Sequence, residues 1–184
     1  MAENSASGCE DLAVSVSDRD HVKGSLSAPV VLVEYGDYEC PDCLNAWPVV
    51  KELKRKFGER LGFVFRHFPQ STIHPHAAAA ARAAEAAGEQ GKYWSMHDQL
   101  FGHQKDLGDV DFTHLALRAG LEVYRFQSSL EREHHLRKIQ DDFASASRSG
   151  VKGTPTFFIN GCRYKGPANL DSLTRAIDQA MPSP

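Results

Sequence analysis

Short apolar runs alternate with segments of helical period along this chain. Residues 30–35 form a nearly continuous apolar run, which predicts a central strand covered on both faces. Residues 41–57 place apolar side chains at helical spacing and Gly58 follows, which predicts a helix. Residues 61–65 predict a second strand. Strand, helix and strand of this length form a right-handed βαβ unit with parallel strands.

Two further segments precede this unit. Residues 1–11 are small, polar and without period, which predicts a flexible tail. Residues 12–16 alternate apolar and polar side chains, which predicts an edge strand. The turn-rich residues 18–29 then lead into the central strand.

A long helical stretch follows the second strand. The pattern predicts helices over residues 77–87, over residues 92–103, from a cap at Asp111 or Thr113 to residue 119, and once or twice within residues 122–149. Strands return at residues 156–159 and 162–164 around an Asn-Gly turn, which is a strong hairpin signal. A final helix, capped near Asn169 or Asp171, ends the pattern.

This order predicts an α/β fold in which helices flank a central mixed sheet. Residues 12–73 and 149–184 form the sheet domain in this interpretation. Residues 74–148 form an all-helical subdomain inserted into it, because the two halves of the sheet need each other.

Composition narrows the functional classes. The chain has 184 residues, 41% hydrophobic and 24% charged, which is typical of one globular domain. A net charge of −3 offers no basic field for nucleic acid, and no apolar run approaches the length needed to insert into a membrane. The polar, acidic N-terminus lacks the pattern of a secretory signal. We therefore expect a cytoplasmic protein, or an exported one if a signal has been trimmed.

Cys40 and Cys43 carry the clearest chemical signal. Cys40 comes where a strand and a short loop enter a helix, so backbone N–H groups and the helix dipole can stabilise its thiolate. Pro41 suits the first helical turn, and Cys43 lies one turn further on. We expect Cys40 to attack substrates and the more buried Cys43 to resolve the mixed disulfide.

A zinc site is the alternative for such a pair. It would need four ligands, and the other cysteines, Cys9 and Cys162, are far apart in sequence. His134 and His135 are neighbours on a predicted helix, where adjacent side chains do not face one another. We therefore predict no metal.

Thr154-Pro155 strengthens the redox interpretation. A trans proline fits poorly where it opens a strand, whereas a cis X-Pro bond costs only about 0.5–1 kcal/mol. A cis bond would turn the backbone toward Cys40 and Cys43 and leave the edge groups of Thr154 free to bind an extended substrate.

Two stretches of the chain resemble the DsbA family of the thioredoxin superfamily. They are residues 37–43, Asp-Tyr-Glu-Cys-Pro-Asp-Cys, and residues 150–159, Gly-Val-Lys-Gly-Thr-Pro-Thr-Phe-Phe-Ile. The likeness extends to Arg-His-Phe-Pro at residues 66–69 and His-Pro-His-Ala at residues 74–77. It covers about residues 20–180 and implies a thioredoxin-like fold with a helical insertion.

The resemblance also assigns roles. It implies a thiol–disulfide oxidoreductase with Cys40 attacking, Cys43 resolving and Pro155 as the cis-proline. Glu34 falls where the family carries a buried acid that exchanges protons with the resolving cysteine. Burial inside an apolar strand would raise the pKa of that carboxyl, which suits such a role.

Substrate contacts and partners follow from the same interpretation. We expect Thr154, Tyr38, Pro41 and Asp42 to contact substrate. The partners would be protein thiols or disulfides and a recycling redox protein, and no cofactor beyond the Cys40–Cys43 disulfide is needed.

Asp42 departs from the Pro-His dipeptide of many exported relatives. Its negative charge, with those of Asp37 and Glu39, predicts a higher pKa for Cys40 and a weaker oxidant than those relatives. The direction of electron flow stays open at this stage.

Two alternative functions also stay open: a redox-switched module that binds clients, and a transferase for small-molecule thiols. A Cys9–Cys162 disulfide is not expected, because a reducing compartment would oppose it.

Overall fold

The computed structural model describes residues 9–130 and 132–182. Five strands form one mixed sheet in the order β1-β3-β2-β4-β5. Their bounds are Val22–Lys23 for β1, Val30–Gly36 for β2, Leu61–His67 for β3, Thr156–Ile159 for β4 and Cys162–Arg163 for β5. β2 and β3 pair in parallel and the remaining pairs are antiparallel, which confirms the predicted βαβ unit and hairpin.

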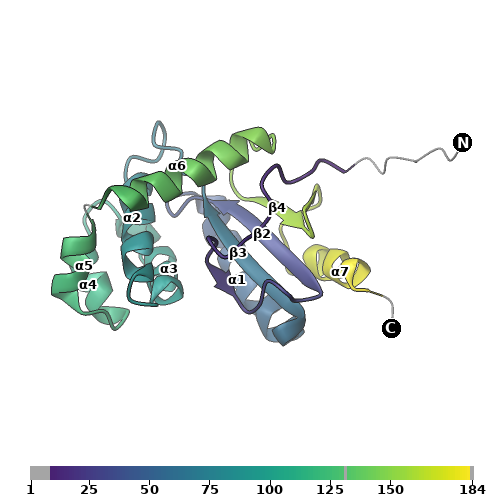
Figure 1. The fold of residues 1–184 in the computed structure, drawn as a ribbon, viewed down its shortest axis with the longest axis horizontal. Coiled ribbons are helices and arrows are strands. Elements are labelled where there is room, and N and C mark those ends of the chain that lie inside the picture. The colour runs from purple at the N-terminus through teal and green to yellow at the C-terminus, as the bar shows by residue number, and fades with distance from the viewer. Residues whose placement is uncertain (1–8, 131, 183–184) are drawn as a thin grey trace, which may run out of the picture.

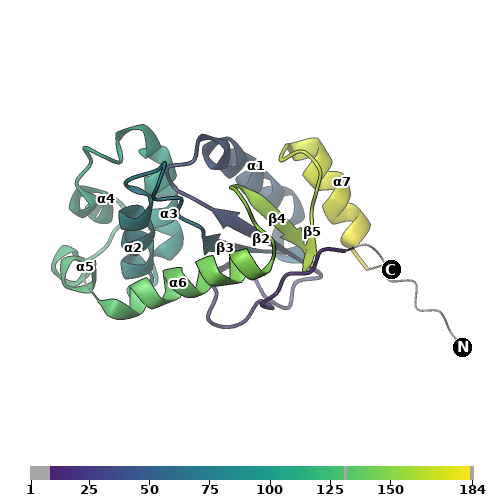
Figure 2. The same cartoon turned by 90° about the horizontal axis from the view of Figure 1, so that it is seen from above.

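Helices cover both faces of this sheet (Figures 1 and 2). α1 and α7 lie on one face and α6 crosses the other, while α2 to α5 gather beyond one end of the sheet. The helices are α1 (Pro41–Phe57), α2 (Ala77–Gly88), α3 (Tyr93–Gly102), α4 (Phe112–Arg118), α5 (Val123–Leu130), α6 (Glu133–Arg148) and α7 (Leu170–Ala180). The thioredoxin-like fold predicted from the sequence is confirmed.

The alternation of side chains along β2 separates two cores. Val30 and Leu32 face α1 and α7 and join the larger apolar cluster, which continues into the helices beyond the sheet. Val31, Val33 and Tyr35 face the opposite way and pack with residues that include Ala146 of α6. Glu34 has the parity of Val30 and Leu32, so the strand aims this carboxyl toward the face that α1 covers.

The first predicted strand is wrong in position. Residues 12–16 form no ladder, and the edge strand β1 lies at Val22–Lys23, inside the segment expected to be turns. Leu12 and Val16 instead pack as apolar side chains against the cluster around Val31 and Val33. The alternation therefore reflects packing on the sheet rather than pairing within it.

The tail predicted over residues 1–11 falls partly outside the described residues. Its last part is held firmly, because Leu12 N–H donates to Gly161 O at 2.8 Å and Arg163 N–H donates to Glu10 O at 3.0 Å. Cys9 and Cys162 form a disulfide with their Cα atoms 5.5 Å apart. The expectation that these two cysteines stay unpaired is wrong.

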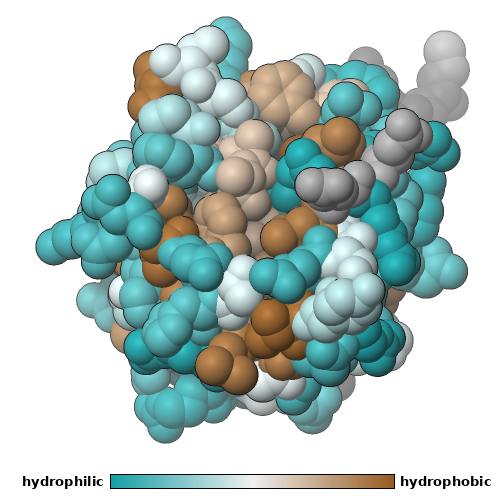
Figure 3. Space-filling model, turned by 90° about the vertical axis from the view of Figure 1, so that its left-hand side faces the viewer, coloured by the Kyte–Doolittle hydropathy of each residue, from teal (hydrophilic) through white to brown (hydrophobic). Residues whose placement is uncertain are grey.

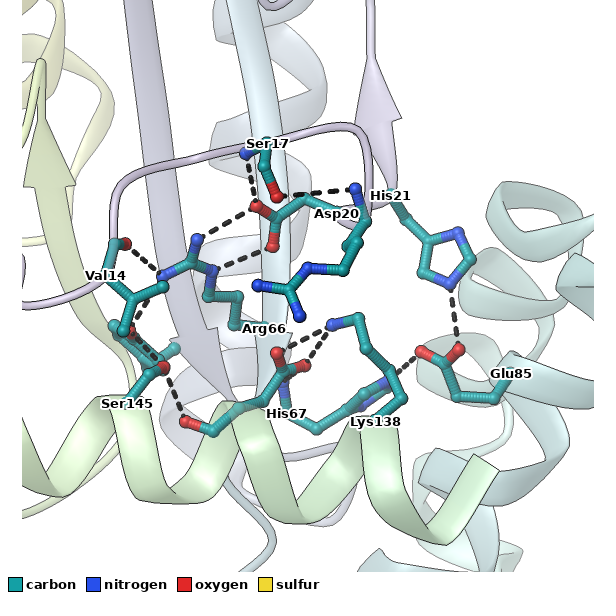
Figure 4. A network of polar contacts seen from close by, with 12 residues as sticks. Val14, Ser17, Asp20, His21, Arg66, His67, Glu85, Lys138 and Ser145 are labelled. Atoms are coloured by element: carbon teal, nitrogen blue, oxygen red, sulfur yellow. Dashed lines mark hydrogen bonds and ion pairs between the residues drawn. The ribbon is translucent and has the colours of Figure 1, made fainter. Parts of the chain in front are cut away.

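A buried polar network joins the inserted helices to the sheet (Figure 4). Glu85 of α2 contacts His67 at the end of β3 at 2.8 Å and His21 before β1 at 3.0 Å. Arg66 of β3 binds both oxygens of Asp20 at 2.8 and 2.9 Å. These contacts pair the buried charges along the junction, which a low-dielectric interior requires.

The outer face of the helical insertion is mostly hydrophilic (Figure 3). Apolar groups appear in several places between the polar side chains, and the exposed ones include Leu117 and Tyr124. No helix in the described part of the chain is both long and apolar enough to cross a bilayer.

Candidate active site

Cys40 lies at the junction between the sheet and α1. The chain leaves β2 at Gly36, and Cys40 occupies the N-cap position with φ −75° and ψ 122°. Pro41 fills the first helical position, where a backbone N–H is not required. Cys40 is 6% exposed and Cys43, one turn later, is fully buried. Both carry free thiols.

The two thiols differ sharply in acidity. A hydrogen bond from Cys43 is the largest cause that lowers the pKa of Cys40 to about 6, and contacts with Thr154 and with the backbone of Cys43 and Asp42 add to it. Burial raises the pKa of Cys43 well above its ordinary value, and the hydrogen bond with Cys40 acts in the same direction. Cys40 is therefore the thiolate near neutral pH, and Cys43 keeps its proton.

Thr154 and Pro155 face this pair from the start of β4. The Thr154–Pro155 bond is cis. The Cys40 Sγ lies 3.3 Å from the Thr154 carbonyl oxygen, although 114 positions separate the two residues in sequence. The predicted cis-proline therefore directly follows the residue whose carbonyl contacts the Cys40 sulfur.

Glu34 is buried beneath the same pair. Its side chain is on the α1 side of β2, only 2% of the residue is exposed, and Oε1 has no hydrogen-bond partner among the described residues. Desolvation, followed by the charge of Cys40, raises the pKa of Glu34 to about 8. Its charge also affects the pKa of Cys43. A carboxyl with this pKa can both release and accept a proton near neutrality.

A buried carboxylate, Asp37, organises the loop before Cys40. It accepts hydrogen bonds from Glu39 N–H and Gln70 N–H, each at 2.8 Å, and its Oδ2 lies 2.8 Å from His74 Nδ1. The Gln70 side chain in turn accepts a hydrogen bond from Thr154 Oγ1 at 3.3 Å. Asp37 therefore connects the loop before Cys40 to the loop after β3 and, through Gln70, to the residue before Pro155.

Gln104 holds the same loop from the helical insertion. Its Nε2 donates to Tyr38 O at 2.9 Å and to Cys40 O at 2.8 Å. The sequence predicted neither the contacts of Gln104 nor the structural role of Asp37. The Asp37 position lies inside the quoted family motif, which was a usable signal, but nothing in the sequence around Gln104 indicates this contact.

Tyr38 is not placed to contact a substrate. It is 1% exposed, its ring packs against Phe65 and Phe101, and its hydroxyl lies 3.0 Å from His97 Nδ1. The prediction that Tyr38 lines a peptide surface is therefore wrong for this structure. Pro41 and Asp42 are exposed beside Cys40, so their substrate contacts stay predictions.

Two of the three acidic residues near Cys40 are paired with histidine side chains. Asp37 is buried against His74, and Glu39 lies 2.9 Å from His76 Nδ1. Asp42 is exposed to solvent, and its backbone N–H lowers the pKa of Cys40. The acidic residues were expected to raise the pKa of Cys40. Hydrogen bonds to the Cys40 sulfur lower that pKa instead.

One cluster of metal-binding residue types lies away from the cysteines. The Nε2 atoms of His134 and His135 lie 2.9 and 3.2 Å from Glu89 Oε1, so these adjacent histidines do converge, contrary to expectation. The Arg132 guanidinium also contacts Glu89, at 3.1 Å. That positive charge opposes a cation at the same carboxylate.

Comparison with known proteins places the chain in a family. The sequence profile of a family described as thioredoxin matches residues 16–179. The chain therefore belongs to the thioredoxin family.

Several solved structures share this fold. BdbD from Bacillus subtilis superposes with a TM-score of 0.80 at 22% identity, covering 93% of this chain and 98% of that one. Wolbachia pipientis α-DsbA1 gives a TM-score of 0.76 at 23% identity, with 90% and 92% coverage. A thioredoxin-like oxidoreductase from Silicibacter pomeroyi gives 0.75 at 28% identity, with 89% and 93% coverage. These structures share the fold of this chain, and its free cysteine pair at the start of α1 supports thiol–disulfide exchange in general.

Curated relatives of this chain are named as antiporters. A protein named Na(+)/H(+) antiporter NhaA 1 from Salinispora arenicola is 46% identical over 175 residues, which is 95% of this chain and 27% of the relative. A relative named Na(+)/H(+) antiporter NhaA from Herminiimonas arsenicoxydans is 38% identical over 159 residues, 86% of this chain and 25% of the relative. The chain thus spans about a quarter of the length of these relatives.

The predicted cytoplasmic location is wrong. Relatives that match nearly the whole chain carry the names of antiporters, which are membrane proteins, and this does not fit a cytoplasmic protein. The Cys9–Cys162 disulfide agrees with the correction, because structural disulfides are rare in the cytosol.

Proposed function

We propose that this chain exchanges disulfides with protein substrates through Cys40 and Cys43. The observation that carries the proposal is geometric: Cys40 is at the N-cap of α1 with its sulfur 3.3 Å from the carbonyl of Thr154, just before the cis-proline, and Cys43 is buried one turn behind it. The pKa values agree with this arrangement, because that of Cys40 is lowered to about 6 and that of Cys43 is raised. One thiol is ready to attack at neutral pH, and the other must lose a proton before it can act.

The reducing direction proceeds in two steps. The Cys40 thiolate attacks one sulfur of a substrate disulfide, the substrate S–S bond breaks, and one substrate thiolate leaves while a mixed disulfide forms. The carboxylate form of Glu34 then takes the proton of Cys43, and Cys43 attacks the Cys40 sulfur. The second substrate thiolate leaves as the Cys40–Cys43 disulfide forms, so two electrons pass from the dithiol to the substrate. The proton of Cys43 is then on Glu34, and the two substrate thiolates take their protons from the solvent. Oxidation of a substrate dithiol is the reverse.

Residues around the pair have supporting roles in this proposal. Thr154 and Pro155 present the backbone edge on which an extended substrate would lie next to Cys40, with Pro41 and Asp42 on the exposed side of the pair. Asp37 and Gln104 are positioning residues, because they act on the loop rather than on the substrate.

The acidity of Cys40 favours an oxidising role. A stabilised thiolate stabilises the reduced form, and this raises the reduction potential of the pair. Equilibration against glutathione buffers of known ratio measures that potential. A potential above that of the compartment in which the protein works supports oxidation of client dithiols, and a potential below it supports reduction.

The proposal is tested by comparing disulfide-exchange turnover of the wild type with that of variants in which Cys40 or Cys43 is replaced. Wild-type protein and the variants Cys40→Ser and Cys43→Ser are compared for reduction of insulin and oxidation of a model dithiol peptide. We expect turnover by the wild type and background rates for Cys40→Ser. Full activity in Cys40→Ser would mean that the chemistry lies elsewhere.

A second candidate is a redox-switched binding module. It is favoured by the antiporter names of relatives in which this domain makes up only about a quarter of the chain, since a domain joined to a transporter could respond to redox state without turning over substrates. Client binding that survives Cys40→Ser, together with turnover at background level in the wild type, would favour this candidate.

A further inference from the structure

A broad polar cavity lies beside the cis-proline. It has a volume of about 820 Å³ and is lined by Pro155 and Thr156, by the end of α6, and by the residues around the β4–β5 hairpin. Thr154, next to Pro155, is the residue whose carbonyl lies 3.3 Å from the Cys40 sulfur. A substrate cysteine held at Cys40 would therefore bring its flanking residues to the edge of this cavity.

The lining is rich in positive charge. Arg148, Lys152, Arg163 and Lys165 all contribute to it, against the carboxylates of Glu10 and Asp11. Arg163 and Lys165 each pair with Glu10, at 3.2 and 2.7 Å. Arg148 and Lys152 are exposed and form no ion pair within the part of the chain that the structure describes.

The chain itself shows what this surface accepts. Cys9, Glu10 and Asp11 lie extended along β5, held by backbone hydrogen bonds at Glu10 and Leu12 and by the Cys9–Cys162 disulfide. Glu10 meets two of the cavity's cations in this arrangement. An extended, acidic, cysteine-containing segment is thus already bound at one rim, while the cations at the other rim have no partner of this kind.

We propose that this cavity selects protein substrates whose reacting cysteine is flanked by acidic residues, with Arg148 and Lys152 as the specificity residues. The proposal rests on the proposed function, since it concerns which substrates reach Cys40. Lys152 lies two positions before Thr154, and extended chain advances about 3.3 Å per residue. A substrate acid within about three residues of its cysteine would come within reach.

The local field must act against the charge of the whole molecule. The chain carries a net charge of −3, which by itself disfavours acidic substrates. A preference for acidic peptides would therefore have to come from the cations near Pro155. It should also weaken as ionic strength rises, because salt screens exposed charges over about 10 Å at 0.1 M.

The test uses three peptides of equal length, each with one cysteine disulfide-bonded to a coloured thiol. Two positions on each side of the cysteine are Asp in the first peptide, Asn in the second and Lys in the third. Reduced protein releases the coloured thiol, and the second-order rate constant is measured for each peptide at low and high salt. We expect the Asp peptide to react about threefold faster than the Asn peptide, and the Lys peptide more slowly than both.

Charge reversal identifies the residues responsible. The double variant Arg148→Glu with Lys152→Glu should reverse the order of the three peptides. Arg118→Glu in α4, at an exposed position outside the cavity lining, is the matched control and should keep the wild-type order. Equal rates for the three peptides with wild-type protein, or an unchanged order in the double variant, would overturn the inference.

The outcomes separate this inference from the proposed function. If none of the peptides reacts, or if Cys40→Ser reacts as fast as wild type, the proposed function itself fails. If oxidised glutathione reacts faster than every peptide and slows in the double variant, the cavity serves a small anionic thiol, and its assignment to protein substrates is wrong.

Discussion

Burial and hydrogen bonding set the chemistry of single residues in this protein. Cys40 is 6% exposed, and contacts around its sulfur lower its pKa to about 6. Cys43 is fully buried, and its pKa rises. The Glu34 side chain lies on the face of the sheet that α1 covers, and its Oε1 has no hydrogen-bond partner within the described chain. A carboxyl in this setting favours its neutral form.

Glu34 should make stability depend on pH. Its pKa in the folded protein is raised to about 8, from 4.5 in an unfolded chain. Between these values the unfolded chain loses a proton that the folded protein keeps, so stability falls as pH rises. We expect Glu34→Gln to raise the free energy of unfolding by on the order of 3 kcal/mol at pH 7 relative to its effect at pH 4. Urea unfolding at both pH values measures this difference.

The same variant should slow resolution of mixed disulfides by about tenfold or more, because Cys43 loses its proton acceptor. Glu59→Gln, at an exposed glutamate just after α1, is the control and should change neither quantity. A Glu34→Gln protein with wild-type resolution kinetics would remove Glu34 from the mechanism.

Individual elements are held in place by a few long-range contacts. Gln104, in the 3-10 turn Gln104–Asp106 after α3, reaches back to the carbonyls of Tyr38 and Cys40. The loop between β2 and α1 is thus held by Gln104 as well as by the hydrogen bonds of Asp37. The position of the attacking thiol therefore depends on the helical insertion as well as on the sheet.

We expect Gln104→Leu to lower the rate of disulfide exchange about fivefold and stability by about 1–3 kcal/mol, since Tyr38 O and Cys40 O both lose the Gln104 donor and Cys40 O retains the one from Leu44 N–H. Exchange rates at a temperature where the protein stays folded, together with urea unfolding, measure both effects. The matched control is Gln140→Leu on the exposed side of α6, which should leave both unchanged. Identical exchange rates for the two variants would contradict the positioning role of Gln104.

The Cys9–Cys162 disulfide secures the N-terminal segment to β5. It closes a separation of 153 residues, so removing it should lower the free energy of unfolding by about 2–5 kcal/mol. The double variant Cys9→Ser with Cys162→Ser, unfolded under oxidising conditions, measures this loss. Exchange at Cys40 should persist in the folded variant. An unfolding midpoint equal to that of the parent would show that the bridge does not form.

Elements with a strong local pattern could be predicted from the sequence, whereas long-range contacts could not. The helix from Pro41 to Phe57 and the hairpin at Asn160 carry their own signals, and the structure has both. The alternation at residues 12–16 failed, because packing on a sheet and pairing within it leave the same pattern. Gln104 left no signal at all, because its partners are backbone carbonyls more than 60 positions away.

At the scale of the whole molecule, buried charges join the insertion to the sheet. Glu85 connects α2 with His67 and His21, and Lys138 of α6 pairs with Asp142, whose Oδ2 accepts from His67 N–H at 3.1 Å. The contacts of Glu85 with His67 and His21, drawn in Figure 4, and the contact of Asp142 with His67 join segments far apart in sequence. The two parts of the molecule should therefore unfold together.

Glu85→Gln tests that coupling. Hydrogen bonds from His21 and His67 overcome desolvation and hold the pKa of Glu85 well below its usual range. This stabilisation is present above the unfolded pKa of about 4.5 and is lost as pH falls below it. We expect the variant to lower the free energy of unfolding by about 3 kcal/mol at pH 7 and by less at pH 3.

The control for this variant is Glu52→Gln, which alters an exposed pair with Arg55 and should change stability little. Circular dichroism and the fluorescence of Trp47 and Trp94 should report one transition in each protein. A Glu85→Gln protein as stable as the control at pH 7 would contradict the role given to the network.

A trapping experiment decides whether Cys40 attacks substrates and Cys43 resolves the mixed disulfide. Cys43→Ser protein is incubated with a peptide disulfide, and the trapped species is mapped by mass spectrometry. We expect a stable mixed disulfide at Cys40, formed with a pH midpoint of about 6. In the reciprocal Cys40→Ser variant, the buried Cys43 should trap none. Substrate bound to Cys43, or no mixed disulfide in either variant, would show that these roles are wrong.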